Sequence, residues 1–280
     1  MEINNTNLKN TNLKDLLKRA SQLFDNSIKA KHNDLCTHSS MGSRKTGLYM
    51  NKHTAHEFYL IWCELLHRDF PVYTCNFGCL AELPKQYHCT QLFIDFDRKK
   101  EVKSEDDIHI LTSDEEITEI IYLYQSILKS VIHHKDMNIS RLDCIVLKKE
   151  PYIKNEEDKL TLKHGFHLQF PNIFLSSEDR NRVILIVKSL WKNPNEIDNV
   201  CNNPWLIYGS QKNSYSGSYT VDHIVCENGN KFHDINMYFN KYHLLDNSEN
   251  QIKFTDEHTA IYYLPMILSL SSLFIKGEDK

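Results

Sequence analysis

The chain has 280 residues, a formal net charge of −4 and 25% charged residues. This length can bury a substantial core, as one large domain or as two closely packed modules, and the slight net acidity argues against a surface coated with positive charge for holding duplex DNA. No window approaches the roughly 18 consecutive apolar residues of a membrane span, and the polar N-terminus does not resemble a secretory signal, so we expect a soluble, intracellular protein.

Hydrophobic periodicity predicts helices and strands in alternation along the chain. Helices are expected from Leu13 to Phe24, from Thr54 with Glu57 at capping-box spacing, from Ser113 to Ile132, and over 177–191. Strands are expected over 91–97, 142–147, 161–170, 205–208 and 219–226, with loops over 32–50 and 148–160. This order predicts an α/β or α+β class, with a helical segment over 1–30 ahead of a single domain over 31–280.

An acidic pair closes the apolar strand expected at 91–97. Side chains alternate between the two faces of a strand, so Asp95 and Asp97 point the same way while Phe96 points into the core. Carboxylate oxygens are hard ligands that bind Mg²⁺ or Mn²⁺, and such ions usually act on phosphates. Taken alone, the pattern also fits an ordinary solvated strand edge.

The strand expected at 161–170 has one polar and one apolar face. Lys163, Gly165 and His167 share the polar face, whereas Phe166 and Leu168 share the face that can enter a core. A cation, a residue without a side chain and an imidazole donor suit a polyphosphate ligand. The alternative is a half-exposed strand whose His and Lys are incidental.

A third group of candidates lies near residue 200. Asp198 is a lone acid that follows the helix over 177–191. In the turn Tyr208-Gly-Ser-Gln-Lys212, backbone amides, the Ser210 hydroxyl and the Lys212 ammonium could bind phosphate. An ordinary turn with a solvated lysine is the alternative.

Eight cysteines are scattered through the chain without a repeated spacing. In a reducing compartment they are most simply buried thiols. Cys75, Cys79, His88 and Cys89 are zinc-type ligands, but they lack the usual paired short spacings. We therefore expect no zinc site.

The order of the pieces resembles the archaeo-eukaryotic primase superfamily, and most closely the primase module of the primase–helicases of large nucleocytoplasmic DNA viruses, the poxvirus type included. In that family an acidic pair, a small residue followed by His, and a third acid form three motifs. The matching positions here are Asp95 and Asp97, Gly165 and His167, and Asp198. The resemblance spans roughly residues 40–275.

The resemblance implies a primase catalytic fold, in which an N-terminal α/β unit packs on an RRM-like unit with a mixed sheet. It implies a nucleotidyltransferase, a DNA primase or primase-polymerase, that uses two Mg²⁺ or Mn²⁺ ions held by the three acids. Nucleoside triphosphate would be bound by Lys163, Gly165, His167, Ser210 and Lys212. The partners would be a single-stranded DNA template and a replicative helicase in cis or in trans, and a viral protein would work at a replication site in the host cytoplasm.

The chain departs from the family pattern at several positions. Leu206 stands where several relatives have Arg, Ser271 lies near the place of an expected Arg, and Gly165 replaces a frequent Ser. No phosphate-binding loop of the helicase type occurs in these 280 residues. Two other functions stay open: a metal-dependent phosphodiesterase or nuclease using the same acids and histidine, and a non-catalytic nucleic-acid-binding module of a replisome.

Overall fold

The computed structural model describes residues 6–28, 36–41, 46–132, 142–156, 159–199, 202–212, 217–242, 244, 251–254 and 259–270. The chain forms two compact units. Unit 1 comprises Met1–Tyr87, Pro204–Ser214 and Leu245–Lys280, and unit 2 comprises His88–Asn203 and Tyr215–Leu244. This division differs from the expected segment 1–30 and domain 31–280, because the first long helix packs against the next one and so belongs to unit 1.

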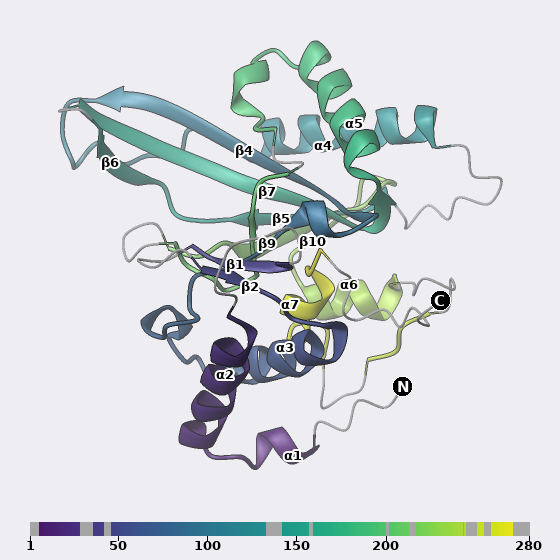
Figure 1. The fold of residues 1–280 in the computed structure, drawn as a ribbon. Coiled ribbons are helices and arrows are strands. Elements are labelled where there is room, and N and C mark those ends of the chain that lie inside the picture. Colours follow the sequence, from purple (N-terminus) through teal and green to yellow (C-terminus); the bar gives the residue numbers. More distant parts are fainter. Residues whose placement is uncertain are drawn as a thin grey trace. The chain divides into compact units, whose positions relative to one another are not determined.

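Unit 1 combines helices with a small antiparallel sheet (Figure 1). Its helices are α1 (Thr6–Lys9), α2 (Leu13–Ser27), α3 (Lys52–His67) and α7 (Leu264–Ile267), with short 3-10 turns at Val72–Thr74 and Pro84–Gln86. Its sheet has the order β2-β1-β3-β8, formed by β1 (His38–Ser40), β2 (Thr46–Leu48), β3 (Leu80–Glu82) and β8 (Trp205–Leu206). The strands β1 and β2 lie where we expected only a loop.

Helix α3 begins two residues before the predicted start. The side chain of Asn51 accepts a hydrogen bond from the backbone N–H of Thr54, so Asn51 is the N-cap. A capping box from Thr54 to Glu57 is therefore wrong, although the helix itself is confirmed. Asn and Thr are both good cap residues, and the spacing alone did not distinguish them.

Unit 2 is built on a larger sheet with the order β10-β9-β5-β7-β4, and β6 pairs with the part of β7 that precedes its pairing with β5. Its strands are β4 (Thr90–Val102), β5 (Cys144–Lys148), β6 (Tyr152–Glu156), β7 (Lys159–Leu175), β9 (Thr220–Val225) and β10 (Lys231–Phe232). All pairings between these described strands are antiparallel, so the expected mixed sheet is wrong. The reason is that β7 lies between β4 and β5, which share a direction but are not neighbours.

Two helices, α4 (Asp114–Val131) and α5 (Ser177–Leu190), cover one face of this sheet (Figure 1). The predicted capping box that opens α4 is confirmed, with Ser113 and Glu116 bonded reciprocally. Alternate residues of β4 and β7 enter the core beneath these helices: Leu92, Ile94, Phe96, Phe166, Leu168 and Phe170. The stacked rings of Phe96 and Phe166 lie 4.4 Å apart. The acids of β4 must consequently point to the opposite face.

The strands β4 and β7 are longer than the sequence pattern predicted. Their pairing runs from Thr90 opposite Leu175 to Val102 opposite Leu160. Together with β6 they form a ribbon that extends beyond α4 and α5 (Figure 1). The ribbon was missed because its charged residues lack the apolar alternation that marks a half-buried strand. A short helix, α6 (Ile235–Lys241), and a 3-10 turn at Pro194–Glu196 complete unit 2. Within the described ranges, no helix is both long and apolar enough to cross a membrane.

Candidate active site

The acidic pair and the histidine motif lie side by side on β4 and β7. Asp95 is directly opposite His167 in the antiparallel register, and Asp97 is directly opposite Gly165. Directly opposed residues of an antiparallel pair point to the same face. The Oδ1 atom of Asp95 lies 3.4 Å from Nε2 of His167. These four residues therefore form two neighbouring rows on the face away from α4 and α5.

Gly165 makes room for the second acid. A Cβ atom at this position would lie 2.3 Å from Oδ1 of Asp97 and 2.8 Å from the carbonyl oxygen of Phe96. Both distances are too short for any real side chain to fit without displacing its neighbours. The Asp97 carboxylate can therefore occupy this position only because residue 165 has no side chain.

The third acid is held beside β4 by its main chain. The backbone N–H of Asp198 donates to the carbonyl oxygen of Asp95 at 2.9 Å, and Ile197 forms a β-bridge with Phe96. Ile197 is fully buried while Asp198 is exposed. The structure thus places the backbone of Asp198 next to that of Asp95, although about a hundred residues separate them in the chain.

The three carboxylates influence one another electrostatically. Burial, and after it the charge of Asp95, raises the pKa of Asp97 above its ordinary value. Burial and the charges of Asp95 and Asp97 raise the pKa of Asp198 in the same direction. Lys149 and Lys99 act the opposite way on Asp97. A site in which several anions repel one another is one that a bound cation stabilises.

The chemistry of these donors fits a hard divalent cation. Carboxylate oxygens are the ligands that Mg²⁺ and Mn²⁺ prefer. In the described part of the chain, however, no three His, Cys, Asp or Glu side chains are yet gathered closely enough to form a set of metal ligands.

Tyr219 and Lys149 lie beside the residues of the sequence motifs. The ring of Tyr219 stacks on His167 with centroids 3.5 Å apart and an interplanar angle of 22°. The Lys149 ammonium lies 4.4 Å from the centroid of the Tyr219 ring and 5.2 Å from that of Tyr152. The sequence did not mark Tyr219 as a site residue, because only the pairing of β5 with β9 brings it here.

The predicted phosphate ligands fall in different places. Lys163 lies on the same face as Gly165, in the row formed with Lys99 of β4 and Tyr152 of β6. Successive rows on one face are about 7 Å apart, so Lys163 is close to the acids. A contact between Lys163 and phosphate stays a prediction.

Ser210 and Lys212 belong to unit 1. The Ser210 side chain is buried, and its hydroxyl accepts from the N–H of Leu80 at 2.9 Å and donates to the carbonyl oxygen of Leu80 or of Gly78, at 3.0 and 3.2 Å. This hydroxyl therefore fixes the turn to β3, and a contact of Ser210 with phosphate stays a prediction. Lys212 is exposed, and its role stays a prediction.

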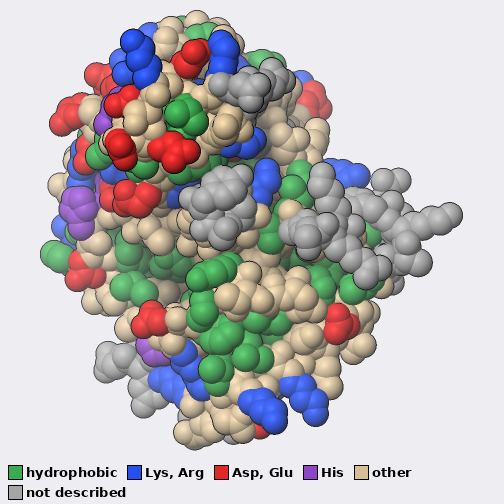
Figure 2. All heavy atoms as spheres, turned by 90° about the vertical axis from the view of Figure 1, so that its left-hand side faces the viewer, with side chains coloured by type: hydrophobic (Ala, Val, Ile, Leu, Met, Phe, Trp, Pro, Cys, Tyr) green, Lys and Arg blue, Asp and Glu red, His purple; other side chains and the backbone are tan. Residues whose placement is uncertain are grey.

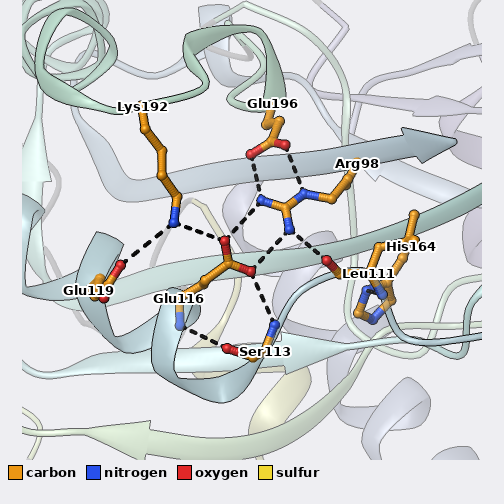
Figure 3. Close-up of polar contacts among 8 residues, drawn as sticks. All are labelled: Arg98, Leu111, Ser113, Glu116, Glu119, His164, Lys192 and Glu196. Carbon is orange, nitrogen blue, oxygen red and sulfur yellow. Dashed lines mark hydrogen bonds and ion pairs between the residues drawn. The ribbon is translucent and has the colours of Figure 1, made fainter.

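An arginine clamp supports the segment that carries the third acid (Figure 3). Arg98 donates to both carboxylate oxygens of Glu196, at 2.7 and 2.9 Å, and to Glu116 at 3.0 Å. The hydrogen bond from Arg98 lowers the pKa of Glu116 to about 2. Lys192 also approaches Glu116, at 3.0 Å. Because Glu196 lies two residues before Asp198, the clamp fixes the approach of this segment to β4.

Replacing Arg98 by methionine is expected to lower the free energy of unfolding of the protein by about 2–4 kcal/mol. The change leaves two partly buried carboxylates without their cation, which costs more than the loss of an exposed pair. Arg182→Met is the matched control, because Arg182 forms an exposed ion pair with Glu178 on α5 and should matter by less than about 1 kcal/mol. Urea unfolding of both variants measures the difference, and equal losses would contradict the clamp.

The fold and the site define a class of protein. An acidic pair on one strand, a glycine and a histidine opposite it, and a third acid bonded to the same strand form the arrangement expected of an archaeo-eukaryotic primase catalytic domain. Residues 37–225 match the family model described as the C962R protein N-terminal AEP domain, in which AEP denotes archaeo-eukaryotic primase. The match covers more than half of the chain, which therefore belongs to this family.

Two viral proteins are similar to the chain over most of its length. "Putative helicase 184R" of Invertebrate iridescent virus 6 is 29% identical over 260 residues, covering 84% of this chain and 25% of the viral protein. "Putative helicase 121R" of Invertebrate iridescent virus 3 is 29% identical over 262 residues, covering 85% of this chain and 26% of the viral protein. The chain thus spans about a quarter of the length of these relatives.

Proposed function

We propose that the chain is the catalytic module of a DNA primase or primase-polymerase, which joins nucleotides in the order set by a template. The observation that carries the proposal is the placement of Asp95 and Asp97 on the face of β4 that also holds Gly165 and His167, with the backbone of Asp198 bonded to that of Asp95. Family membership supports the same activity. The three acids, Gly165 and His167 all belong to unit 2, so this part of the proposal does not depend on where unit 1 lies.

Asp95, Asp97 and Asp198 would hold Mg²⁺ or Mn²⁺. Such ions, when bound, lower the pKa of an attacking hydroxyl and neutralise the charge of a triphosphate. The residues of β4 set the position of two carboxylates, and the backbone bond to Asp95 sets the position of the third. Because these two acids share one face of β4, the side chains on its other face pack in the core.

His167 would act as a hydrogen-bond donor to the triphosphate, and not as a general base. Its ring is held on one side by Tyr219 and faces Asp95 through Nε2. Lys163 and Lys149 would contribute positive charge to the same ligand. In this arrangement the triphosphate would lie between the acids with their bound cations and the lysines on the same face.

The expected partners are a single-stranded DNA template, nucleoside triphosphates and a helicase. The relatives named helicases are about four times as long as the matched region, which supports a helicase in the same polypeptide or in a partner. Their viral origin supports action at a viral replication site. These assignments belong to the proposal.

The proposal is tested by supplying single-stranded template, labelled nucleoside triphosphates and Mn²⁺. Short labelled products whose sequence follows the template are expected. Shortening of the template without added nucleotides would instead identify a nuclease. Manganese binding without any product would identify a non-catalytic module, and either result would overturn the proposal.

A further inference from the structure

The peptide group that joins Ile197 to Asp198 is hydrogen-bonded at both of its ends. Its N–H, which belongs to Asp198, donates to the carbonyl oxygen of Asp95 at 2.9 Å. Its carbonyl oxygen, which belongs to Ile197, accepts from Nζ of Lys188 at 2.8 Å. Because a peptide group is planar, two bonds at opposite ends fix the orientation of its plane. The main chain at the third acid is therefore held from β4 on one side and from α5 on the other.

Lys188 extends from a part of α5 that is packed against the core. Val187, the residue before it, is fully buried, and its carbonyl oxygen accepts from the N–H of Trp191 at 2.9 Å. The Trp191 ring lies edge-on to Phe96 of β4, with the ring centroids 6.5 Å apart. Phe96 is the residue between the two acids of β4. The backbone of Lys188 is consequently fixed relative to the strand that carries those acids.

A lysine in the last turn of a helix commonly has a simpler role. Its charge stabilises the partial negative charge of the final carbonyl groups of its own helix, or lies in solvent. Lys188 is half-buried, and its hydrogen bond goes instead to a residue nine positions further along the chain, beyond the end of α5. The simpler role does not account for this contact.

The charge of Lys188 is not neutralised by a neighbouring acid. On the face shown in Figure 2, Lys and Arg are interspersed with Asp and Glu. Among the residues that the structure describes, by contrast, no carboxylate forms an ion pair with Lys188. Burial and the two acids of β4 raise the pKa of Asp198, whereas the charges of Lys99 and Lys188 lower it, so the Lys188 ammonium lies near this carboxyl. A hydrogen bond from a charged donor is roughly twice as strong as one between neutral groups.

We propose that Lys188 is a positioning residue for the third acid. By binding the carbonyl group of Ile197, its ammonium keeps the backbone of Asp198 beside that of Asp95 and so limits the positions that the Asp198 carboxylate can adopt. Lys188 acts through the main chain and needs no contact with nucleotide or metal. The consequence for synthesis rests on the proposed function, whereas the positioning of Asp198 does not.

Amide hydrogen exchange of the whole chain, measured by NMR without metal or nucleotide, tests the positioning directly. Lys188→Met keeps an apolar stem but removes the ammonium, so exchange of the Asp198 amide should become about tenfold faster. The Trp191 amide should keep its wild-type rate, because its bond to Val187 lies within the end of α5. Lys188→Arg retains a donor and should stay within about twofold of the wild type. Unchanged exchange at Asp198 in Lys188→Met, or equal acceleration at Trp191, would contradict the positioning role.

The consequence for synthesis is measured by the steady-state constants. Lys188→Met should lower kcat by about tenfold, because the third acid is less well placed, and should change the KM for nucleotide by less than about threefold. Lys188→Arg should recover most of the lost kcat. Arg182→Met is the matched control, because it removes one positive charge from the exposed side of α5 and should leave both constants unchanged.

The positioning role and the proposed function fail in different ways. Faster exchange at Asp198 in Lys188→Met, without any template-directed product from the wild type, would reject the proposed function and support the role of Lys188. Product from the wild type and from Lys188→Met at equal kcat, with equal exchange at Asp198, would reject the role of Lys188 and leave the proposed function intact.

Discussion

Asp97→Asn is expected to reduce template-directed synthesis by about 10³-fold while leaving the protein as stable as the wild type or slightly more stable. Burial and the charge of Asp95 raise the pKa of Asp97, so its ionised form carries a cost in the folded state. Asparagine removes this cost but also removes a charge that would bind metal. Thermal unfolding and the rate of nucleotide incorporation measure the two effects separately.

Asp95→Asn should reduce synthesis to a similar degree, and Asp106→Asn provides the matched control. Asp106 is exposed in the segment after β4, so its substitution should leave both the rate and the melting temperature unchanged. Addition of Mn²⁺ should raise the melting temperature of the wild type and of Asp106→Asn more than that of Asp97→Asn. Full synthesis by both Asp95→Asn and Asp97→Asn would remove these acids from the chemistry.

Substitutions of Gly165 are expected to reduce synthesis, most severely where a large, branched side chain is introduced. Any Cβ here meets Oδ1 of Asp97 and the carbonyl oxygen of Phe96, so Gly165→Ala should displace the carboxylate and lower the rate by about 10²-fold. Overpacking of this kind also destabilises by about 1–3 kcal/mol. Gly165→Val should be inactive. Gly165→Ser should lose less than Gly165→Ala, since its hydroxyl can donate to the displaced carboxylate.

The three variants serve as controls for one another, because each adds a different side chain at the same Cα atom. Rates at saturating nucleotide, the KM for nucleotide and the Mn²⁺-induced change in melting temperature should be measured together. Because Asp97 is the group that moves, we expect a lower kcat and a smaller increase in melting temperature on addition of Mn²⁺. The KM for nucleotide should change less. A valine variant with wild-type kcat would show that the close contact has no role in synthesis.

Local patterns predicted the elements of unit 2 that contain the site. The alternation of apolar residues in 91–97 and 161–170 predicted which side chains share a face, and the register Asp95–His167 and Asp97–Gly165 confirms it. The Ser113–Glu116 capping box was predicted for the same reason, since capping is decided within one turn of helix. These features depend on neighbours within a few residues.

Other features depend on contacts between distant segments. Tyr219 enters the site through the pairing of β9 with β5, and nothing in its own surroundings marks it. Ser210 shows the opposite case, because a turn that suits phosphate in sequence uses its hydroxyl to bond β3. The Arg98 clamp joins β4 to Glu116 and Glu196, which are separated from it by 18 and 98 residues. The periodicity of a sequence does not reveal which distant segments pair.

Glu116 performs two tasks at once. Its carboxylate closes the reciprocal cap at the start of α4 by accepting from the N–H of Ser113 at 3.4 Å, and it also binds Arg98. The start of a core helix and the loop leading to the third acid therefore share one anion. Fraying at the start of α4 and movement of the segment that carries Asp198 should therefore occur together. The rigidity of the face that holds the acids depends in part on contacts on the opposite side of the sheet.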